Sequence, residues 1–350
     1  MRIGLLTGGG DCPGLNAVIR AVVVAGDVHY GDRCVGFLDG WLGAIEGRTI
    51  ELDPDRCRGI LSRGGTILGS SRTNPFATPD GPDRVMATIE DLSLDAVVAI
   101  GGDDTLGVAA GLADRGLAVV GVPKTIDNDL PGTEVTFGFD TAVQIVTDAI
   151  DRLQTTAESH HRVMVCEVMG RNVGHIATHA GIAGGAAEIL VPEVPFSIDE
   201  VCERLRRRHQ RGRYFSTVVV AEGALPEDGE DLVAAQAARS PAAGTDQFGH
   251  ARLGGIGNFL AFEIERRTGF ETRATVLGHI QRGGTPTAYD RVLATRFGAE
   301  ALAALHDGDS GVMVALVAGQ IERLPLSEAR GTPKTVDRHL LDDVAAAYLG

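Results

Sequence analysis

The sequence predicts an α/β protein made of two packed units with mainly parallel sheets. Short runs of β-branched residues alternate with amphipathic stretches along almost the whole chain, which is typical of repeated β–α–β units. With 350 residues, the chain is long enough for two such units rather than one. Its 47 glycines lie mainly where strands should meet helices, so they indicate loops rather than low-complexity sequence.

The expected elements follow from the spacing of the apolar residues. Residues 139–157 place alanine, isoleucine, valine and leucine side chains at helical intervals, which predicts a long amphipathic helix. The segment 225–255 is acidic at first and then rich in alanine, serine, proline and glycine, which predicts a surface excursion from the α/β framework. The expected strands are 3–7, 34–38, 96–100, 118–122, 162–168, 216–221 and 275–277.

Composition and charge restrict the class of protein. A net charge of −15 argues against non-specific nucleic-acid binding, which needs a basic face, but it permits a small anionic substrate held by a few arginines. No apolar run approaches the length of a membrane span, and the run after Met1 is too short for a secretory signal, so we expect a cytoplasmic protein with no membrane partner. The scattered cysteines predict reduced thiols rather than a disulfide framework or a zinc site; they are Cys12, Cys34, Cys57, Cys166 and Cys202.

Two loops rich in small residues are candidates for phosphate binding. The first, 7–16, follows a strand and opens a helix, so its glycines would let the backbone approach an anion at a helix N-terminus. It lacks the spacing of a dinucleotide-binding fingerprint and the lysine of a Walker A loop, and a plain tight turn stays an alternative. The second, 64–75, contains Arg72, which is either solvated or neutralises charge on a transferred phosphoryl group.

Acid-rich loops follow two consecutive expected strands, and open α/β sheets bind ligands at the carboxyl ends of their strands. An N-cap role accounts for one of Asp103 and Asp104, but two adjacent carboxylates repel each other unless a cation lies nearby. The next loop contains Thr125, Asp127 and Asp129. Phosphoryl transfer to an alcohol needs one carboxylate as a base and another to hold Mg²⁺, so the two loops predict a magnesium–phosphate site.

Arginines and a histidine at further strand ends suit a sugar phosphate, because guanidinium groups bind phosphate bidentately. Any single one is more often solvated, but five or six at such positions favour a binding role. The pair His160-His161 suggests a metal, yet no third ligand stands at metal-binding spacing. The candidate residues of this part of the chain are Arg162, Met169, Gly170, Arg171, Glu222, Arg273, His279 and Arg282.

Six motifs together resemble those of the 6-phosphofructokinases, in the same order. They are GGGDCPGLN at 8–16, GGDDT at 101–105, PKTIDND at 123–129, MGR at 169–171, AEG at 221–223 and GHIQRGG at 278–284. The resemblance extends beyond residue 300 and looks closest to the bacterial branch of pyrophosphate-dependent and mixed enzymes. It implies the phosphofructokinase fold, with two three-layer α/β/α sandwiches and an active site in the cleft between them. It also implies a donor domain of residues 1–138 and 283–332 and a sugar-phosphate domain of residues 139–282 and 333–350.

The resemblance implies roles for residues at matching positions. Asp127 corresponds to the general base on the 1-hydroxyl of fructose 6-phosphate, and Asp103 to the magnesium-linked acid. Arg72 and Arg171 match residues that stabilise the transferred phosphoryl group. The residues implied to bind the phosphoryl donor are Gly10, Gly102, Asp104, Thr105 and Lys124, and those implied to bind the sugar are Thr125, Asp129, Met169, Gly170 and Glu222. His279 and Arg282 are implied to bind the 6-phosphate in the same subunit. The resemblance also implies a homodimer or homotetramer, in which Arg162 and Arg273 bind the 6-phosphate in the site of a neighbouring subunit.

The chain departs from the family pattern in two places. Many relatives in this branch have histidine and tryptophan where it has Asn172 and His175, which predicts altered packing below the site but leaves Arg171 in place. The basic effector-binding positions of allosteric ATP-dependent relatives are neutral here, so we expect little control by ADP or phosphoenolpyruvate. These positions are Ala21, Ala25, Pro54 and Gln154.

The phosphoryl donor depends on Asp104 and Lys124. ATP-dependent relatives carry glycine at the first position, and a like-charge contact with a nucleotide phosphate at about 4 Å costs on the order of 4 kcal/mol at an effective dielectric constant near 20. That free energy corresponds to roughly a thousandfold loss of binding. Lys124 can neutralise charge on pyrophosphate, but some ATP-using members share it, so it is permissive. We therefore expect Mg²⁺-dependent transfer from pyrophosphate to fructose 6-phosphate. The resemblance implies that this step is nearly reversible and serves both glycolysis and gluconeogenesis.

Other functions stay open. The nearest is an ATP-dependent or dual-donor phosphofructokinase, and another is the same chemistry on sedoheptulose 7-phosphate or a further ketose phosphate. A non-catalytic sugar-phosphate sensor is less favoured, because the expected base, magnesium ligand and arginine are all present. A dinucleotide-dependent dehydrogenase is weaker still, because the first loop lacks the required glycine spacing.

Overall fold

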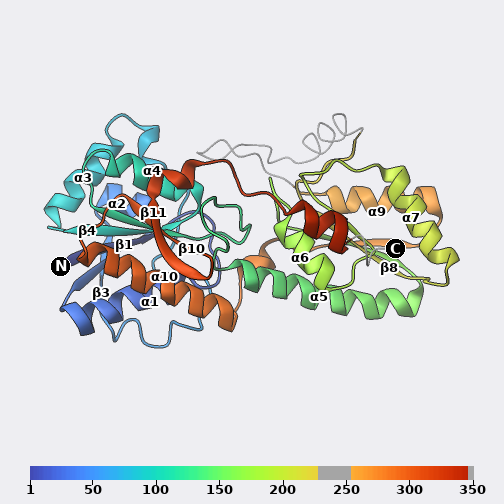
Figure 1. The fold of residues 1–350 in the computed structure, drawn as a ribbon, viewed down its shortest axis with the longest axis horizontal. Helices are drawn as coiled ribbons and strands as arrows, with labels where there is room; N and C mark the ends of the chain where they lie inside the picture. The colour runs from blue at the N-terminus through green and yellow to red at the C-terminus, as the bar shows by residue number, and fades with distance from the viewer. Residues whose placement is uncertain (228–253, 346–350) are drawn as a thin grey trace. The chain divides into compact units, whose positions relative to one another are not determined.

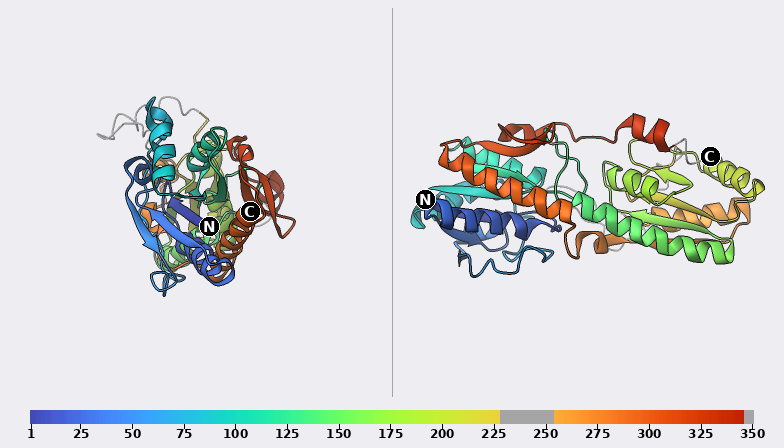
Figure 2. Two further views of the ribbon diagram at one scale, coloured as in Figure 1. Left: turned by 90° about the vertical axis from the view of Figure 1, so that its left-hand side faces the viewer. Right: turned by 60° about the horizontal axis from the view of Figure 1, so that its bottom comes forward.

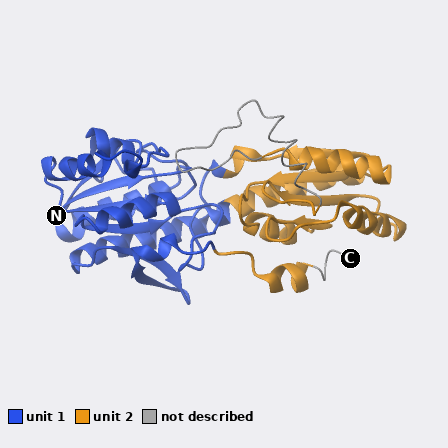
Figure 3. Cartoon of the chain, turned by 90° about the horizontal axis from the view of Figure 1, so that it is seen from above, with its two compact units in different colours: residues 1–141, 246–250, 282–333 blue, residues 142–245, 251–281, 334–350 orange. Residues whose placement is uncertain are grey.

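The computed structural model describes residues 1–227 and 254–345 (Figure 1). Its described residues form two compact units: unit 1 contains 1–141 and 282–333, and unit 2 contains 142–227, 254–281 and 334–345 (Figure 3). Most of the expected excursion at 225–255 lies outside the described residues. The division into a donor domain and a sugar-phosphate domain stays a prediction, with boundaries within a few residues of these units.

Unit 1 is built on a seven-stranded sheet in the order β11-β10-β5-β4-β1-β2-β3. The two pairs at the edges, β2–β3 and β10–β11, are antiparallel, and the other neighbours are parallel. Every residue of β4 and β5 is buried, as expected for central parallel strands covered on both faces. The strands are β1 (Arg2–Thr7), β2 (Arg33–Phe37), β3 (Thr49–Leu52), β4 (Ala96–Gly101), β5 (Val119–Pro123), β10 (Val312–Val317) and β11 (Gln320–Pro325).

Helices cover both faces of this sheet. On one face, α2 (Trp41–Glu46), α3 (Gly81–Asp91) and α4 (Asp103–Ala113) share an apolar core with the strands (Figure 1). On the other, α1 (Leu15–Ala25) and α10 (Ala288–His306) lie side by side (Figure 2). Their backbones approach closely at one glycine of α10, where an added Cβ would come within 2.8 Å of a side chain of α1. The remaining short helices of unit 1 are η1 (Gly26–Tyr30), η2 (Pro75–Ala77) and η4 (Leu326–Arg330).

Unit 2 has a four-stranded parallel sheet in the order β7-β8-β6-β9. Helices α7 and α9 pack on one face of it, while α5 and α6 lie on the other (Figure 1). The strands are β6 (Val163–Val168), β7 (Glu188–Leu190), β8 (Ser216–Ala221) and β9 (Thr272–Val276). The helices are α5 (Phe139–His160), α6 (His175–Ala183), α7 (Ile198–Gln210), α9 (Ile256–Thr268), η3 (Gly278–Arg282) and η5 (Leu340–Ala345).

The predicted fold class is confirmed, since both units place helices on the two faces of a mainly parallel sheet. The seven predicted strands correspond to β1, β2, β4, β5, β6, β8 and β9, although β9 begins at Thr272 rather than at 275. The predicted helix 139–157 is α5, which continues to His160. A search of the described helices for a membrane-spanning candidate found none.

A buried carboxylate secures the start of α10. Asp290 is 0% exposed and accepts hydrogen bonds from the Thr141 N–H at 2.8 Å and the Thr141 hydroxyl at 2.5 Å. The hydroxyl of Thr287, the N-cap of α10, donates to Asp140 at 2.6 Å. Burial raises the pKa of Asp290 to about 6, because the apolar surroundings disfavour the charged form.

The variant Asp290→Asn is expected to change how stability depends on pH. The raised pKa means that the folded protein holds this proton more tightly than the unfolded chain, so the contribution of Asp290 to stability is present at low pH and is lost as pH rises through about 6. Asparagine cannot ionise, so the variant should gain stability relative to the original chain by up to about 3 kcal/mol between pH 4 and pH 7.5. Urea unfolding at several pH values measures this gain. The exposed Asp91→Asn is the control, and a constant difference between Asp290→Asn and the original chain would contradict the expectation.

Candidate functional site

The glycine-rich loop 8–14, called the donor loop because Gly10 is predicted to bind the phosphoryl donor, lies at the carboxyl end of β1 and is fixed by its neighbours. The Gly8 N–H donates to the Ile100 carbonyl of β4 at 2.9 Å, and the Gly9 N–H donates to the Ser71 carbonyl at 3.1 Å. The Ser70 hydroxyl donates to the Gly9 carbonyl at 2.5 Å. Gly9 has a φ of +77°, in the left-handed region that favours glycine. The first two candidate phosphate loops therefore form one structure.

Lys124 and Arg282 both lie against Gly10. The Lys124 Nζ donates to the Gly10 carbonyl at 2.5 Å, and the lysine is only 3% exposed. A Cβ added at Gly10 would lie 2.5 Å from Nη1 of Arg282, and that guanidinium also donates to the Asp11 carbonyl at 3.4 Å. A larger residue at position 10 would therefore displace the guanidinium of Arg282. The site thus presents two positive charges to an anion held by this loop.

Burial lowers the pKa of Lys124, since the ammonium is less well solvated inside the protein, and the charge of Arg282 lowers it further. The carboxylates of Asp127 and Asp103 raise it. A phosphate group would add negative charge next to the ammonium and favour its charged form. An anion bound beside Lys124 would therefore raise the pKa of its ammonium group.

The acidic loops bring three carboxylates close enough to affect one another. Burial, then the charge of Asp127, then that of Asp103, raise the pKa of Asp129 to about 7. The Asp127 N–H donates to the Thr125 hydroxyl at 3.0 Å, which shapes the loop after β5. Asn128, between the two aspartates, has a φ of +54°, a conformation more accessible to asparagine than to most residues. Sequence alone predicted the three acids, and the structure shows that their charges interact.

These carboxylates fit a magnesium ion that is bound together with a phosphate donor. Among the described residues, no group of three or more histidine, cysteine or acidic side chains could hold a metal by itself. Mg²⁺, however, is commonly held by one or two carboxylates with water and substrate phosphates. Burial is the main cause of the raised pKa of Asp129, and the charges of Asp127 and Asp103 add to it; a divalent cation beside these carboxylates would offset the added charge. Asp103, the predicted ligand, is exposed in the first turn of α4.

Arg72 and the helix that begins at Asp103 complete this side of the site. Arg72 directly follows Ser71, whose hydroxyl donates to the Asp39 carbonyl at 2.6 Å and whose carbonyl accepts from the donor loop. Thr105 is buried in α4, with its hydroxyl 2.5 Å from the position of a Cβ on Gly8. Gly102 is the N-cap of α4, and Asp104 is half-buried. All the predicted donor-binding residues belong to unit 1.

A second group of predicted residues lies at the carboxyl ends of the unit 2 strands. Met169 and Gly170 follow β6, and the Gly223 N–H, after β8, donates to the Gly170 carbonyl at 3.0 Å. The Glu222 N–H donates to the Val168 carbonyl at 2.8 Å. Gly170 has a φ of +143°, and a Cβ there would lie 2.6 Å from the Val173 carbonyl, so this turn requires glycine. The structure therefore brings Met169, Gly170 and Glu222 together, with Arg171 next in the chain.

Arg162 and Arg273 lie at the opposite end of the same sheet. Both pair with Glu271, at 2.8 Å from Arg162 and 2.7 Å from Arg273. Arg162 directly precedes β6, and Arg273 is the second residue of β9, beside Met164. They are therefore separated from Met169 by the length of β6. A role in the site of a neighbouring subunit stays a prediction for both.

The two residues predicted to share the 6-phosphate fall in different units. His279 lies in η3 of unit 2, whereas Arg282 is grouped with unit 1 and contacts the donor loop. His175, one of the two departures, is buried at the start of α6, where its Nε2 lies 2.9 Å from the Lys334 carbonyl. Burial lowers the pKa of His175. This imidazole therefore anchors the chain where it enters unit 2 for the last time.

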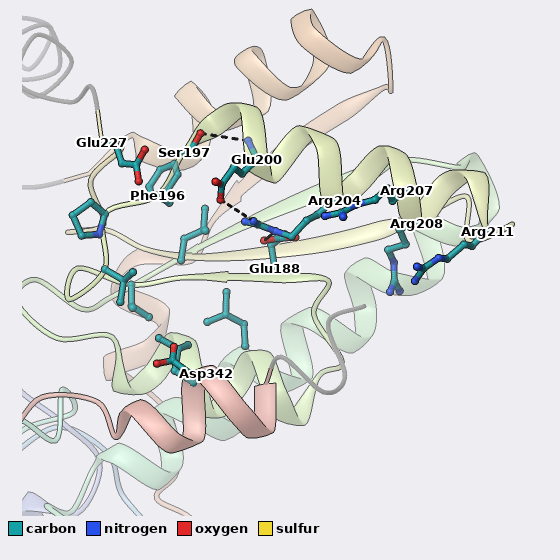
Figure 4. Close-up of a pocket in the computed structure, with 16 residues that line it drawn as sticks. Glu188, Phe196, Ser197, Glu200, Arg204, Arg207, Arg208, Arg211, Glu227 and Asp342 are labelled. Carbon is teal, nitrogen blue, oxygen red and sulfur yellow. Dashed lines mark hydrogen bonds and ion pairs between the residues drawn. The ribbon is translucent and has the colours of Figure 1, made fainter.

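Cavities in the two units differ in whether predicted site residues line them. A cavity of about 410 Å³ in unit 1, at the start of α4, is lined by residues that include Asp103, Asp104, Phe76 and Arg330. A cavity of about 560 Å³ in unit 2 lies between β7, α7 and η5 (Figure 4). Its lining includes an ion pair between Arg204 and Glu188 at 2.8 Å but none of the predicted site residues. Chemistry rather than cavity size therefore identifies the candidate site.

Comparison with known proteins identifies the family. The family model described as phosphofructokinase matches residues 2–305. The chain belongs to this family.

Among its relatives, the pyrophosphate–fructose 6-phosphate 1-phosphotransferase of Streptomyces coelicolor is 56% identical over 99% of this chain and 100% of its own. The ATP-dependent 6-phosphofructokinase 3 of the same organism is 54% identical over 96% of each chain. The solved structure of Pichia pastoris phosphofructokinase in the T-state has a TM-score of 0.82 and 32% identity, and the match covers 99% of this chain and 36% of that one. Full-length relatives of similar identity thus carry names with different phosphoryl donors.

Sequence reasoning missed several residues that hold the phosphofructokinase site together. Thr7, Thr66 and Ser70 tie the second loop to the first, with the two threonine hydroxyls 2.9 Å apart. They lie in segments that the sequence had already indicated. The carboxylate of Glu193 accepts hydrogen bonds from the Gly174 N–H and the Val336 N–H, both at 3.0 Å. No sequence motif indicated this residue.

Proposed function

We propose that this phosphofructokinase transfers a phosphoryl group from pyrophosphate to the 1-hydroxyl of fructose 6-phosphate, with Mg²⁺ as cofactor. The observation that carries the choice of donor is Asp104, a second carboxylate beside Asp103 in the first turn of α4. It lines a cavity at the start of α4, and its charge would disfavour a donor that carries further phosphate there. The 56% and 54% identities to the two Streptomyces enzymes differ too little to decide between donors.

In the proposed reaction, the oxygen of the sugar 1-hydroxyl forms a bond to a phosphorus of pyrophosphate. Asp127 accepts the proton of this hydroxyl as the bond forms. The bridging P–O bond breaks, and inorganic phosphate leaves, so that fructose 1,6-bisphosphate is the other product. Mg²⁺, bound through Asp103, would neutralise charge on the pyrophosphate oxygens. Lys124, whose Nζ donates to the Gly10 carbonyl of the donor loop at 2.5 Å, would stabilise the negative charge of pyrophosphate bound at that loop. Arg72 and Arg171 are proposed to stabilise the transferred group.

The sugar phosphate is proposed to bind the residues that unit 2 collects at its strand ends. Met169, Gly170 and Glu222 would contact the sugar, and His279 and Arg282 its 6-phosphate. Arg162 and Arg273 lie far from that strand end and would serve the site of a second copy of the chain. We therefore propose a homodimer or homotetramer with shared sites, in which reaction in the reverse direction would use the same groups.

Parallel assays with two donors test the proposal. Fructose 6-phosphate and Mg²⁺ should give fructose 1,6-bisphosphate with pyrophosphate but little product with ATP. Added inorganic pyrophosphatase should abolish the first activity, which excludes a contaminating ATP-dependent enzyme. High turnover with ATP and none with pyrophosphate would favour the second candidate, an ATP-dependent phosphofructokinase. This second candidate is retained because a Streptomyces relative that is 54% identical to this chain is named as an ATP-dependent enzyme.

A further inference from the structure

Gln281 is a buried residue of the GHIQRGG motif to which the proposed reaction gives no role. Its side chain is 0% exposed. The Oε1 atom accepts a hydrogen bond from the Met169 N–H at 3.1 Å, and the Nε2 atom donates to the Gly278 carbonyl at 3.0 Å. Both ends of the amide are therefore engaged inside unit 2.

The first of these bonds continues the sheet beyond the end of its backbone ladder. Strands β6 and β9 pair as far as Glu167 and Val276, and the Leu277 N–H still donates to the Glu167 carbonyl at 3.0 Å. The chain then turns into η3, at Gly278 with a φ of +50°. The Oε1 of Gln281 supplies the acceptor for the next N–H of this edge, that of Met169, which is itself only 7% exposed.

The second bond fixes the turn that carries His279. Because Nε2 donates to the Gly278 carbonyl, the side chain of Gln281 closes η3 on itself across three residues. One amide thus connects two segments with predicted sugar-phosphate residues: Met169–Arg171 after β6, and His279 in η3. A leucine could fill the same volume but would leave the Met169 N–H and the Gly278 carbonyl without these partners.

We propose that Gln281 is a positioning residue, which holds the Met169–Arg171 segment and the His279 turn in register for the sugar phosphate. This inference rests on the proposed function of that site. The alternative is a purely structural role, in which the two hydrogen bonds of Gln281 stabilise unit 2 and do not affect binding of the sugar phosphate. The two roles differ in which kinetic constant changes when the bonds are removed.

Two variants separate these roles. Gln281→Met keeps the length and apolar volume but removes both bonds, and we expect the KM for fructose 6-phosphate to rise at least tenfold while the KM for the phosphoryl donor changes less than twofold. Gln281→Glu, when its carboxyl group is protonated, can make both bonds. Burial raises the pKa of such a carboxyl, so its activity relative to the original enzyme should recover as pH is lowered.

The control is Gln154→Met, which removes another glutamine side-chain bond of unit 2, that from Gln154 to the Gly184 carbonyl. It should leave both KM values unchanged. Thermal unfolding of each variant reports its stability separately. If Gln281→Met lowers the melting temperature but changes neither KM, or changes both KM values equally, the positioning role is wrong.

Failure of the proposed function would be visible separately. The kinetic comparison uses whichever donor the original enzyme accepts, so a wrong choice of donor leaves it intact. If the original enzyme turns over neither donor, the proposed reaction fails, and calorimetric titration with fructose 6-phosphate then compares the variants. A Gln281→Met protein that binds the sugar phosphate as tightly as the original would overturn the inference.

Discussion

The variant Asp127→Asn is expected to lower kcat by about a thousandfold with little change in the binding of fructose 6-phosphate. A positioned general base typically contributes a factor of about 10² to 10⁴, and asparagine cannot accept the proton of the 1-hydroxyl. Steady-state kinetics over a range of pH and calorimetric titration with the sugar phosphate measure the two effects.

The exposed Asp114→Asn, at the end of α4, is the control and should be fully active. Subunit mixing extends the experiment, because Arg162 is proposed to serve a neighbouring copy. Mixed oligomers of Asp127→Asn and Arg162→Gln chains should regain activity, since some of their sites combine two intact halves. Substantial activity in Asp127→Asn alone would contradict the assigned base, and no recovery on mixing would contradict the shared site.

The variant Asp104→Gly is expected to admit ATP in part and to impair the use of pyrophosphate. Removing one like-charge contact at about 4 Å relieves on the order of 4 kcal/mol, so kcat/KM for ATP should rise by up to roughly a thousandfold. The gain should be incomplete, because other parts of the site are adapted to the smaller donor. Initial rates with each donor, at fixed Mg²⁺ and fructose 6-phosphate, measure the change.

Asp104→Asn is the matched control, since it removes the charge and keeps the volume. If charge is the main barrier to ATP, the asparagine variant should gain most of what the glycine variant gains. If volume dominates, only Asp104→Gly should gain activity with ATP. Unchanged kinetics with pyrophosphate, together with no gain with ATP in either variant, would remove Asp104 from the choice of donor.

The elements that sequence predicted best are those in the centre of each sheet. Strand β4 is buried at every position and reads as a continuous apolar run. The strands not predicted are β3, β7 and β11, which lie at sheet edges, and β10, the inner neighbour of β11. The burial of β11 is mixed along its length, and β7 has three residues, so neither produces a clear pattern.

The same distinction applies to the candidate site. The sequence indicated the acids and cations because their residue types and positions after apolar runs carry a chemical meaning. It could not show that Lys124 donates to Gly10, 114 positions apart, or that Arg282 lies against the same loop. Gln281 and Glu193 were missed because an amide or carboxylate that satisfies backbone groups has no characteristic spacing. Such contacts depend on which strands become neighbours.

The position of β10 beside β5 has a consequence for synthesis of the chain. All four strands of unit 2 lie between residues 163 and 276, so they leave the ribosome before Val312, where β10 begins. Until β10 and β11 emerge, β5 would be an uncovered, wholly apolar edge of an incomplete sheet. Such edges pair readily with other chains. Synthesis of unit 1 therefore starts before that of unit 2, but its sheet is completed only after all the strands of unit 2 have been made. A nascent chain that stalls before Val312 would be prone to aggregation.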